Sequence, residues 1–359
     1  MLLYVAAFAV VCLWGVKVKA KNKDFFEDYM SPEKTTAIKG IFIIIVFFSH
    51  FNSYADFTWS GDLFYERIVK AIGQWMVTLF MFYSGYGVAA QIDKKGEGYI
   101  RSMPVKRILS LIFKFDIAVI IFTLIKLILN EKIKGTKFLL SLTGWESMGN
   151  SNWYIFDILL LYAITYIAFR FIKDKKYYIV GSALVALLSM GYILLLAKTD
   201  IKDYWWYDTV LCYSAGMFWF LWRKPLEKLI ADKTAVWLLI FVVFTAASIV
   251  TNKYDQRTAV KILSMLCFTA LVVVATMRIS FFNKALVWCG KHLFEIYILQ
   301  RIPMKLLGRV GFISRNTWLY FALCFAFTAV AAIAFSKLTD KLWKKLCSVF
   351  SKEARSVNY

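Results

Sequence analysis

Apolar runs recur along the whole chain, and they constrain its fold more than any other feature of the sequence. Each run of roughly 17–25 residues is long enough to cross about 30 Å of hydrocarbon as an α-helix. A barrel strand needs only about ten residues in strict alternation, which these runs do not show. The sequence therefore predicts an all-α integral membrane protein. We expect a polytopic helical bundle of about ten core spans plus one N-terminal span.

The expected spans follow one another from the N-terminus to residue 336. Their predicted bounds are 2–16, 38–54, 72–91, 108–129, 153–171, 178–197, 207–222, 234–250, 259–277, 285–304 and 317–336. Three regions follow from these spans. Residues 1–35 are expected to form an anchor span and a basic loop, residues 36–340 the membrane domain, and residues 341–359 a basic tail.

The balance of charge is strongly basic, with 44 Lys and Arg against 23 Asp and Glu. In a soluble protein this excess would indicate nucleic-acid binding. Here the basic residues lie in short loops between apolar runs, as the positive-inside rule expects, so we expect no nucleic-acid partner. The six cysteines lie in or beside apolar runs without zinc-site spacing, and we therefore expect no metal site.

The loops also predict the orientation in a plasma membrane. Basic residues cluster after the first, third, fifth and seventh spans and in the tail, whereas the intervening loops 55–71, 198–206 and 251–258 carry two each. This alternation predicts a cytoplasmic C-terminus and an extracytoplasmic N-terminus. Residues 305–316, with three basic residues, are an exception. The first span has no basic residue before it, which favours a retained anchor over a cleaved signal peptide.

The second span contains the first candidate for chemistry. Lys39 lies at its predicted cytoplasmic mouth, and His50 follows eleven residues later, about 16 Å along a helix axis. A neutral imidazole in the outer half of the membrane can accept a proton from a hydroxyl group, which is the work of a general base. A structural histidine bonded to a neighbouring helix is the alternative explanation.

Two further segments carry polar groups at span ends. Gly85 and Gly87 permit close helix approach, and Ser84 can bond to backbone or ligand, although packing alone explains this motif equally well. Three basic residues then gather at a cytoplasmic mouth, where they can hold phosphates or only fix the orientation. They are Arg101, Lys106 and Arg107.

Polar and aromatic residues also mark the outer half of the predicted bundle. Asn152 and Trp153 lie where the fifth span enters the bilayer, although Trp there also suits the interfacial aromatic belt. In the tenth span Glu295 is predicted near mid-membrane and Tyr297 in the outer half. A buried glutamate must pair with a base or take up a proton. Asp157 is a further intramembrane acid.

Five of these segments, in this order, resemble motifs of the acyltransferase-3 family of membrane O-acyltransferases. Lys39-x10-His50 resembles the family's Arg-x10-His motif. The other four are Leu-Phe-Met-Phe-Tyr-Ser84-Gly85, the basic run through Arg107-Ile108, Asn152-Trp153-Tyr154 with Tyr162, and Gly290-Lys291-His292-Leu-Phe-Glu295-Ile-Tyr297. The resemblance covers about residues 36–305. Lys39 in place of Arg loses bidentate recognition, Pro104 interrupts the family's basic pair, and Gln300 stands where a second His is common.

The resemblance implies an enzyme that transfers an acyl group, most simply acetyl from acetyl-CoA. The donor would be a cytosolic acyl-CoA and the acceptor a hydroxyl group of an extracytoplasmic glycan or a lipid-linked molecule, with no permanently bound cofactor. Lys39, Arg101, Lys106 and Arg107 would bind the CoA phosphates. The expected catalytic residues are His50, Lys39, Glu295, Tyr297, Ser84, Asn152 and Trp153. The rival hypothesis is a proton-coupled transporter or flippase that uses intramembrane Lys39, Asp157, Glu295 and Arg301.

Overall fold

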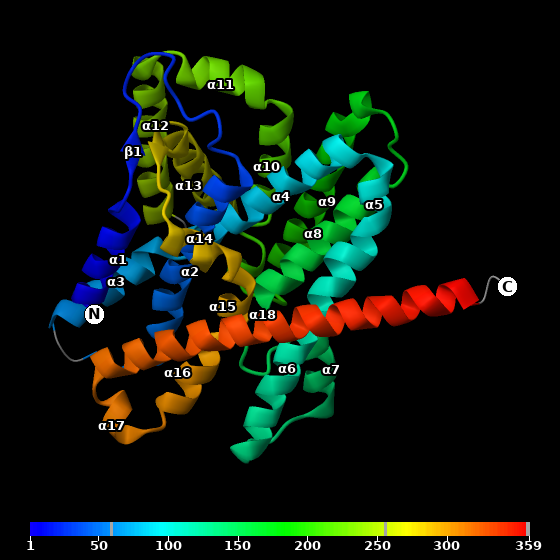
Figure 1. The fold of residues 1–359 in the computed structure, drawn as a ribbon. Helices are drawn as coiled ribbons and strands as arrows, with labels where there is room; N and C mark the ends of the chain where they lie inside the picture. Colours follow the sequence, from blue (N-terminus) through cyan, green and yellow to red (C-terminus); the bar gives the residue numbers. More distant parts are fainter. Residues whose placement is uncertain (58–59, 255–256, 357–359) are drawn as a thin grey trace. The chain divides into compact units, whose positions relative to one another are not determined.

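The structure, a computed structural model, describes residues 1–57, 60–254 and 257–356 (Figure 1). Helices make up nearly all of its regular secondary structure. The first half contains α1 (Leu2–Leu13), β1 (Lys17–Val18), α2 (Pro32–Phe51), α3 (Ser60–Ile72), α4 (Trp75–Lys95), α5 (Glu97–Met103), the π-helix η1 (Pro104–Leu109), α6 (Ser110–Ile128), α7 (Gly135–Leu142) and α8 (Trp153–Phe169).

The second half is equally helical. It contains η2 (Lys175–Tyr177), α9 (Tyr178–Thr199), η3 (Tyr204–Trp206), α10 (Leu211–Leu221), α11 (Arg223–Ala231), α12 (Thr234–Lys253), α13 (Thr258–Arg278), β2 (Ile279–Ser280), α14 (Lys284–Lys291), α15 (Leu293–Leu299), α16 (Arg301–Leu307), α17 (Gly311–Ser314) and α18 (Thr317–Ser356). The predicted span 285–304 is therefore not one helix, because it is interrupted at His292 and divided into α14, α15 and α16.

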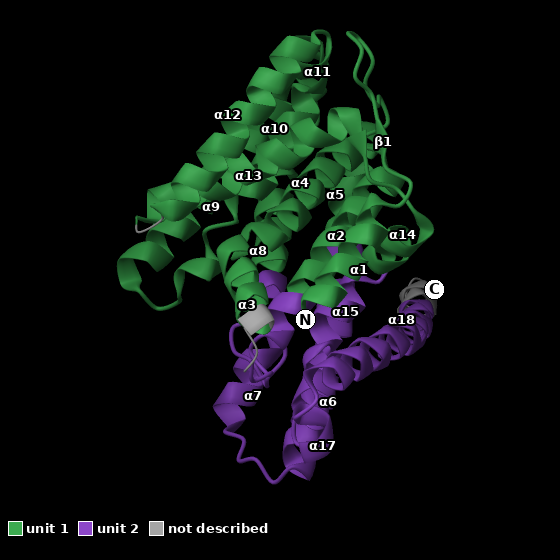
Figure 2. Cartoon of the chain, turned by 90° about the vertical axis from the view of Figure 1, so that its left-hand side faces the viewer, with its two compact units in different colours: residues 1–46, 59–104, 157–291 green, residues 47–58, 105–156, 292–359 purple. Residues whose placement is uncertain are grey.

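The chain forms two compact units, coloured separately in Figure 2. Unit 1 comprises residues 1–46, 59–104 and 157–291, and unit 2 comprises residues 47–58, 105–156 and 292–359. Three helices, α2, η1 and α8, cross from one unit to the other along the chain. Each unit therefore combines segments that are distant in the sequence.

Small residues set the closest helix contacts of unit 1. A methyl group at Gly85 of α4 would lie 1.9 Å from the carbonyl oxygen of Tyr213, and one at Gly216 of α10 would lie 2.0 Å from that of Phe82. These two helices therefore pack backbone to backbone, as small residues allow in membrane bundles. Gly87 has open space around its Cα, so the close approach predicted for this motif depends on Gly85.

The loop before α2 is fixed to unit 1 by a buried arginine. Lys17 and Val18 of β1 pair antiparallel with Ser280 and Ile279 of β2. Arg278, only 1% exposed, donates hydrogen bonds to the carbonyl oxygens of Lys19, Lys21 and Ala231 at 2.8–3.2 Å. Donation to backbone carbonyls offsets part of the cost of burying the guanidinium group.

Aromatic side chains pack the segments of unit 2 together. The ring of Phe321 on α18 stacks on Phe48 at 4.9 Å and meets the edges of Phe47 and Phe51 at 5.4 and 5.1 Å. Edge-to-face and offset pairs of this kind stabilise a core beyond the area that they bury. The end of α2, which carries His50, is held in unit 2 by these contacts.

Several helices present apolar side chains to the outside. Six helices in the described part of the chain are long and apolar enough to cross a membrane, and α1 and α8 are shorter apolar helices. On α12, Leu239 is 63% and Ile249 60% exposed. Such exposed apolar faces would be costly in water and suit a lipid environment. The protein is accordingly a polytopic helical membrane protein, whereas the count of eleven spans remains a prediction.

Candidate active site

His50 is the next-to-last residue of α2. The helix begins at Pro32, whose fixed φ suits a first helical position, and Glu33 in the first turn favours the helix dipole. The helix ends at Phe51 and the chain turns through residues 52–54. His50 therefore lies where the helix gives way to a turn, on the part of α2 that belongs to unit 2.

The imidazole ring is partly exposed, with one nitrogen buried. Its Nδ1 atom has no hydrogen-bond partner among the residues that the structure describes. The alternative of a structural histidine predicts bonds to neighbouring groups, and on Nδ1 no such bond is found within that part of the chain. A buried nitrogen without a hydrogen-bond partner lowers the stability of the fold. A bound ligand that supplies the missing partner would remove this cost.

Two residues of the α15–α16 segment face His50. The ring centroid of Tyr297 lies 6.0 Å from that of His50. Arg301 lies close enough to interact electrostatically with the imidazole. Tyr297 lies near the end of α15, and Arg301 is the first residue of α16, four positions later. A base, a phenol and a guanidinium group thus gather within unit 2.

The loop before α8 lies against this group. Tyr154 packs its ring edge-on to Tyr297 at 5.5 Å, and Trp153 contacts Tyr154 at 6.2 Å. The Nε atom of Arg301 donates a hydrogen bond to Oγ of Ser151 at 3.1 Å. The aromatic residues at the start of α8 are therefore linked to His50 through the ring of Tyr297.

Asn152 closes this loop on itself. Its Nδ2 atom donates to the carbonyl oxygen of Gly144 at 2.7 Å, and Gly144 has a φ of +78°, which favours glycine. The Oδ1 atom of Asn150 accepts the N–H of Met148 at 3.0 Å. One of the two Asn152 amide hydrogens is therefore used for the fold.

Glu295 has different neighbours from Tyr297. The two residues are separated by two positions in α15, so their side chains point to nearly opposite faces. Glu295 is buried, its electrostatic neighbours are Lys114 and His292, and the side chain of Ser336 is its hydrogen-bond partner. The structure therefore gives Glu295 and Tyr297 separate surroundings within unit 2.

Ser84 and two of the predicted phosphate ligands lie in unit 1. Ser84 precedes Gly85 at the contact of α4 with α10, so packing accounts for the glycine of this motif. Arg101 is 76% exposed and its guanidinium group pairs with Glu97 at 2.7 Å. Lys39 lies on the part of α2 that belongs to unit 1.

The other two predicted phosphate ligands lie in unit 2. Lys106 and Arg107 are on η1, the π-helix that starts at Pro104. The proline cannot donate a hydrogen bond to the preceding turn, which explains the local change of helix type. Lys106 is exposed and Arg107 is half-buried, so both are accessible at the surface of their unit.

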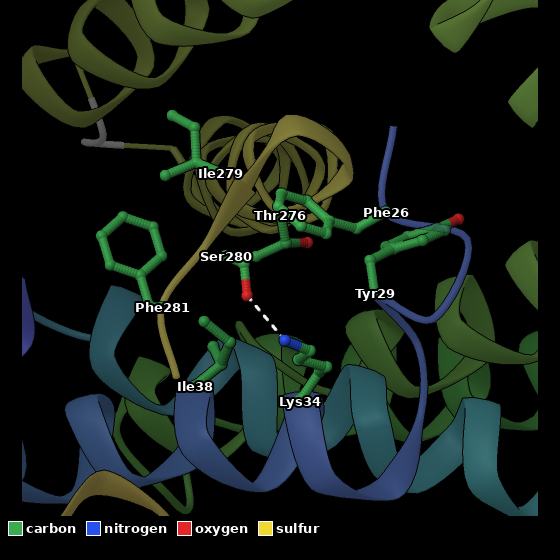
Figure 3. Close-up of a pocket in the computed structure, with 8 residues that line it drawn as sticks. All are labelled: Phe26, Tyr29, Lys34, Ile38, Thr276, Ile279, Ser280 and Phe281. Atoms are coloured by element: carbon green, nitrogen blue, oxygen red, sulfur yellow. Dashed lines mark hydrogen bonds between the residues drawn. The ribbon is translucent and has the colours of Figure 1, made fainter. Parts of the chain in front are cut away.

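A small pocket in unit 1 is lined by eight residues, none of which is a predicted site residue (Figure 3). The Nζ atom of Lys34 donates to Oγ of Ser280 at 2.8 Å and lies over the ring of Phe282 at 4.6 Å. The pocket encloses about 10 Å³ of space, about enough for one water molecule, so it is too small for a larger ligand. The hydrogen bond from Lys34 to Ser280 at this pocket joins the start of α2 to β2.

Arg301, Tyr154 and Ser151 were not predicted as catalytic residues. The spacing of Arg301 from Tyr297 is a helical signal that could have indicated it. The contact between Ser151 and Arg301 joins positions 150 residues apart. Local sequence patterns carry no signal for such a pair.

One of the comparisons with known proteins identifies a family. A family model described as Acyltransferase domain matches residues 36–337, which is most of the chain. No curated protein and no solved structure matched the chain. The matched range contains every one of the predicted catalytic residues. The chain therefore belongs to the acyltransferase-3 family of membrane acyltransferases.

Proposed function

We propose that the protein is a membrane O-acyltransferase that moves an acyl group from cytosolic acyl-CoA to a hydroxyl group of a cell-envelope glycan. The family supports acyl transfer. The observation that carries the proposal for His50 is its buried Nδ1 atom, which has no hydrogen-bond partner in the described part of the chain and lies near Tyr297 and Arg301. An imidazole nitrogen that lacks a protein partner is available to take a proton from an acceptor. The acyl group is most simply acetyl.

The proposed reaction begins with the acceptor hydroxyl group next to His50. The imidazole removes the proton while the hydroxyl oxygen attacks the thioester carbonyl carbon. The resulting tetrahedral oxyanion collapses, the carbon–sulfur bond breaks, and the CoA thiolate takes the proton from His50. The products are an O-acyl ester and free CoA. Arg301 and the second amide hydrogen of Asn152 are the groups that would stabilise the oxyanion in this scheme.

A covalent route through an acyl-imidazole remains open. In that route a ring nitrogen attacks the thioester first and the acceptor hydroxyl then displaces the acyl group. Both routes need a neutral imidazole and give the same products. Brief incubation with labelled acetyl-CoA without acceptor, followed by rapid quenching, would distinguish them by the label that stays on the protein.

The donor would bind by its phosphates at the cytoplasmic ends of the helices. Lys39, Arg101, Lys106 and Arg107 are the proposed partners. The pair of Arg101 with Glu97 is largely exposed, so it contributes little stability and a phosphate could replace the carboxylate. Lys39 and Arg101 belong to unit 1, and Lys106 and Arg107 belong to unit 2.

A proton-coupled transporter is the second candidate, and one observation favours it. Asp157 in unit 1 is fully buried, accepts a hydrogen bond from Tyr192 at 3.0 Å, and has Asp208 as an electrostatic neighbour. Two buried acids in a membrane bundle are typical of proton-coupled transport paths.

Labelled acetyl-CoA tests the two candidates directly. The purified protein in detergent is incubated with acetyl-CoA labelled in the acetyl group and with extracted envelope glycans. The proposed function predicts release of free CoA and label in base-labile esters on the glycan. Absence of both products, together with uptake of a labelled solute by the protein in liposomes, would favour the transporter instead.

A further inference from the structure

A row of basic side chains begins beside His50 and continues along α16. Arg301, the first residue of α16, interacts electrostatically with His50 and donates to Ser151. Lys305 follows one helical turn later, about 6 Å along the axis and on the same face. Arg309 comes just after the helix ends. We call Arg301, Lys305, Arg309 and Lys126 the basic track.

A single carboxylate pairs with three members of the basic track. Glu131, in the loop between α6 and α7, lies 2.7 Å from Nζ of Lys305, 2.8 Å from Nη2 of Arg309 and 3.4 Å from Nζ of Lys126. All four residues belong to unit 2. Three cations around one carboxylate leave a surplus of two positive charges in this cluster. The side chains remain accessible, with 49% of Arg309 and 27% of Glu131 exposed.

More cations follow in the same segments of unit 2. Residues 120–152 and 300–316 contain eight basic residues but only two acidic ones, Glu131 and Glu146. Those outside the track are Lys132, Lys134, Lys137 and Arg315, and all four are exposed. The predicted orientation places these segments on the extracytoplasmic side, where the positive-inside rule gives no reason for a basic excess. A ligand on that side would explain why the charges are there.

We propose that the acceptor of the acyl group is an anionic glycan, whose phosphate or carboxylate groups bind along the basic track while one hydroxyl group reaches His50. This inference rests on the proposed acyl transfer. The track has two cations one turn apart on α16, a third just after this helix and a fourth on α6, so it suits a polymer with repeated charges better than a single small anion. Arg301 connects the track to the candidate catalytic residue, so a bound polymer passes the site of transfer.

The test compares charged and neutral acceptors. Purified protein in phosphatidylcholine nanodiscs receives labelled acetyl-CoA with a poly(glycerol phosphate) oligomer, an oligogalacturonate or a dextran oligomer of similar length. At least one charged oligomer is expected to show a KM about tenfold below that of dextran at 0.05 M salt, and the advantage should shrink at 0.5 M salt because screening shortens electrostatic range. Equal KM values for all three oligomers at low salt would overturn the proposal.

Variants that neutralise single charges test whether the preference for charged acceptors depends on the basic track. Arg309→Gln and Lys305→Gln are each expected to raise the KM for the charged oligomer about fivefold with kcat nearly unchanged, since rim charges mainly affect encounter and binding. Lys344→Gln on α18 removes the same charge from an exposed position outside the track and serves as the matched control. An equal change in all three variants would overturn the assignment to the track.

Two further measurements distinguish failure of the glycan proposal from failure of the proposed acyl transfer. Binding of a fluorescent poly(glycerol phosphate) oligomer or oligogalacturonate is measured without acetyl-CoA, so it tests the track even if no acyl transfer occurs. If transfer fails with every acceptor, the proposed function fails, and loss of this binding in Arg309→Gln would still support an anionic ligand. If Arg309→Gln changes activity only in nanodiscs that contain phosphatidylglycerol, the track binds lipid headgroups and the glycan proposal is wrong.

Discussion

The contact between α4 and α10 predicts opposite effects for two neighbouring glycines. A methyl group at Gly85 would lie 1.9 Å from the oxygen and 2.7 Å from the carbon of the Tyr213 carbonyl group, whereas one at Gly87 would have nothing within 4 Å. The obstacle at Gly85 is backbone, which cannot rotate away as a side chain can. The helices would have to separate by at least about 1 Å, and overpacking of this kind costs about 1–3 kcal/mol.

The matched substitution at Gly87 should act in the other direction. Alanine is favoured over glycine in a helix interior by about 1 kcal/mol, and no contact opposes it here. We therefore expect Gly85→Ala to be less stable than Gly87→Ala by about 1–3 kcal/mol, which is the packing cost alone, because the helix preference is common to both variants. The measurement is thermal unfolding of the purified variants in one detergent, followed by the loss of the monodisperse size-exclusion peak.

The order of the two unfolding temperatures tests the backbone contact between α4 and α10. Unfolding of Gly85→Ala at or above the temperature of Gly87→Ala would refute the backbone contact. Acyl transfer by the surviving folded fraction of Gly85→Ala is informative as well. A normal rate per folded molecule would mean that the Ser84-Gly85 motif serves packing.

Two other predictions concern unit 2. Arg301→Met should lower kcat about 10²-fold, the usual loss when one oxyanion donor is removed, and Arg301→Lys should recover part of it; an unchanged kcat in Arg301→Met would contradict the role. The hydrogen bond from Lys305 holds the pKa of Glu131 below its ordinary value, so the ion cluster stabilises the fold above about pH 4.3 and this contribution is lost as the pH falls through the lowered pKa. Unfolding temperatures measured from pH 6 to pH 3 should therefore fall less steeply in Glu131→Gln, and parallel curves would contradict the pairing.

Long apolar runs were the part of the fold that sequence predicted well. The predicted span 178–197 corresponds to α9, Tyr178–Thr199, because an uninterrupted apolar run in lipid has no alternative to a helix. The predicted span 285–304 is instead three short helices. At His292 the backbone has φ −99° and ψ 20°, outside the helical region, and average hydropathy is insensitive to such a break.

The candidate site was predicted only in part. The motifs pointed to His50 and Tyr297, and the structure places their rings 6.0 Å apart. Glu295 belongs to the same motif as Tyr297, but two positions along a helix turn its side chain to nearly the opposite face of α15. A match to the motif does not show this difference. The contacts of Arg301 depend on tertiary packing between distant segments, which no local pattern encodes.

The exceptional loop 305–316 has a similar explanation. Its basic residues contradict the simple alternation of charge between loops, and the orientation was predicted in spite of them. In the structure Lys305 and Arg309 pair with Glu131, a residue some 170 positions earlier in the chain. Pairing offsets part of the local charge, and the sequence alone does not show which acid provides it.

The most direct test of the account compares the two histidines of the chain. Membrane levels of His50→Ala and His292→Ala are matched by immunoblot, and the purified variants are assayed for transfer of labelled acetyl from acetyl-CoA to envelope glycan. The account predicts that His50→Ala loses transfer by at least about 10²-fold, as removal of a general base does, while His292→Ala retains it. Full transfer by a folded His50→Ala protein would contradict the assignment of the chemistry to His50.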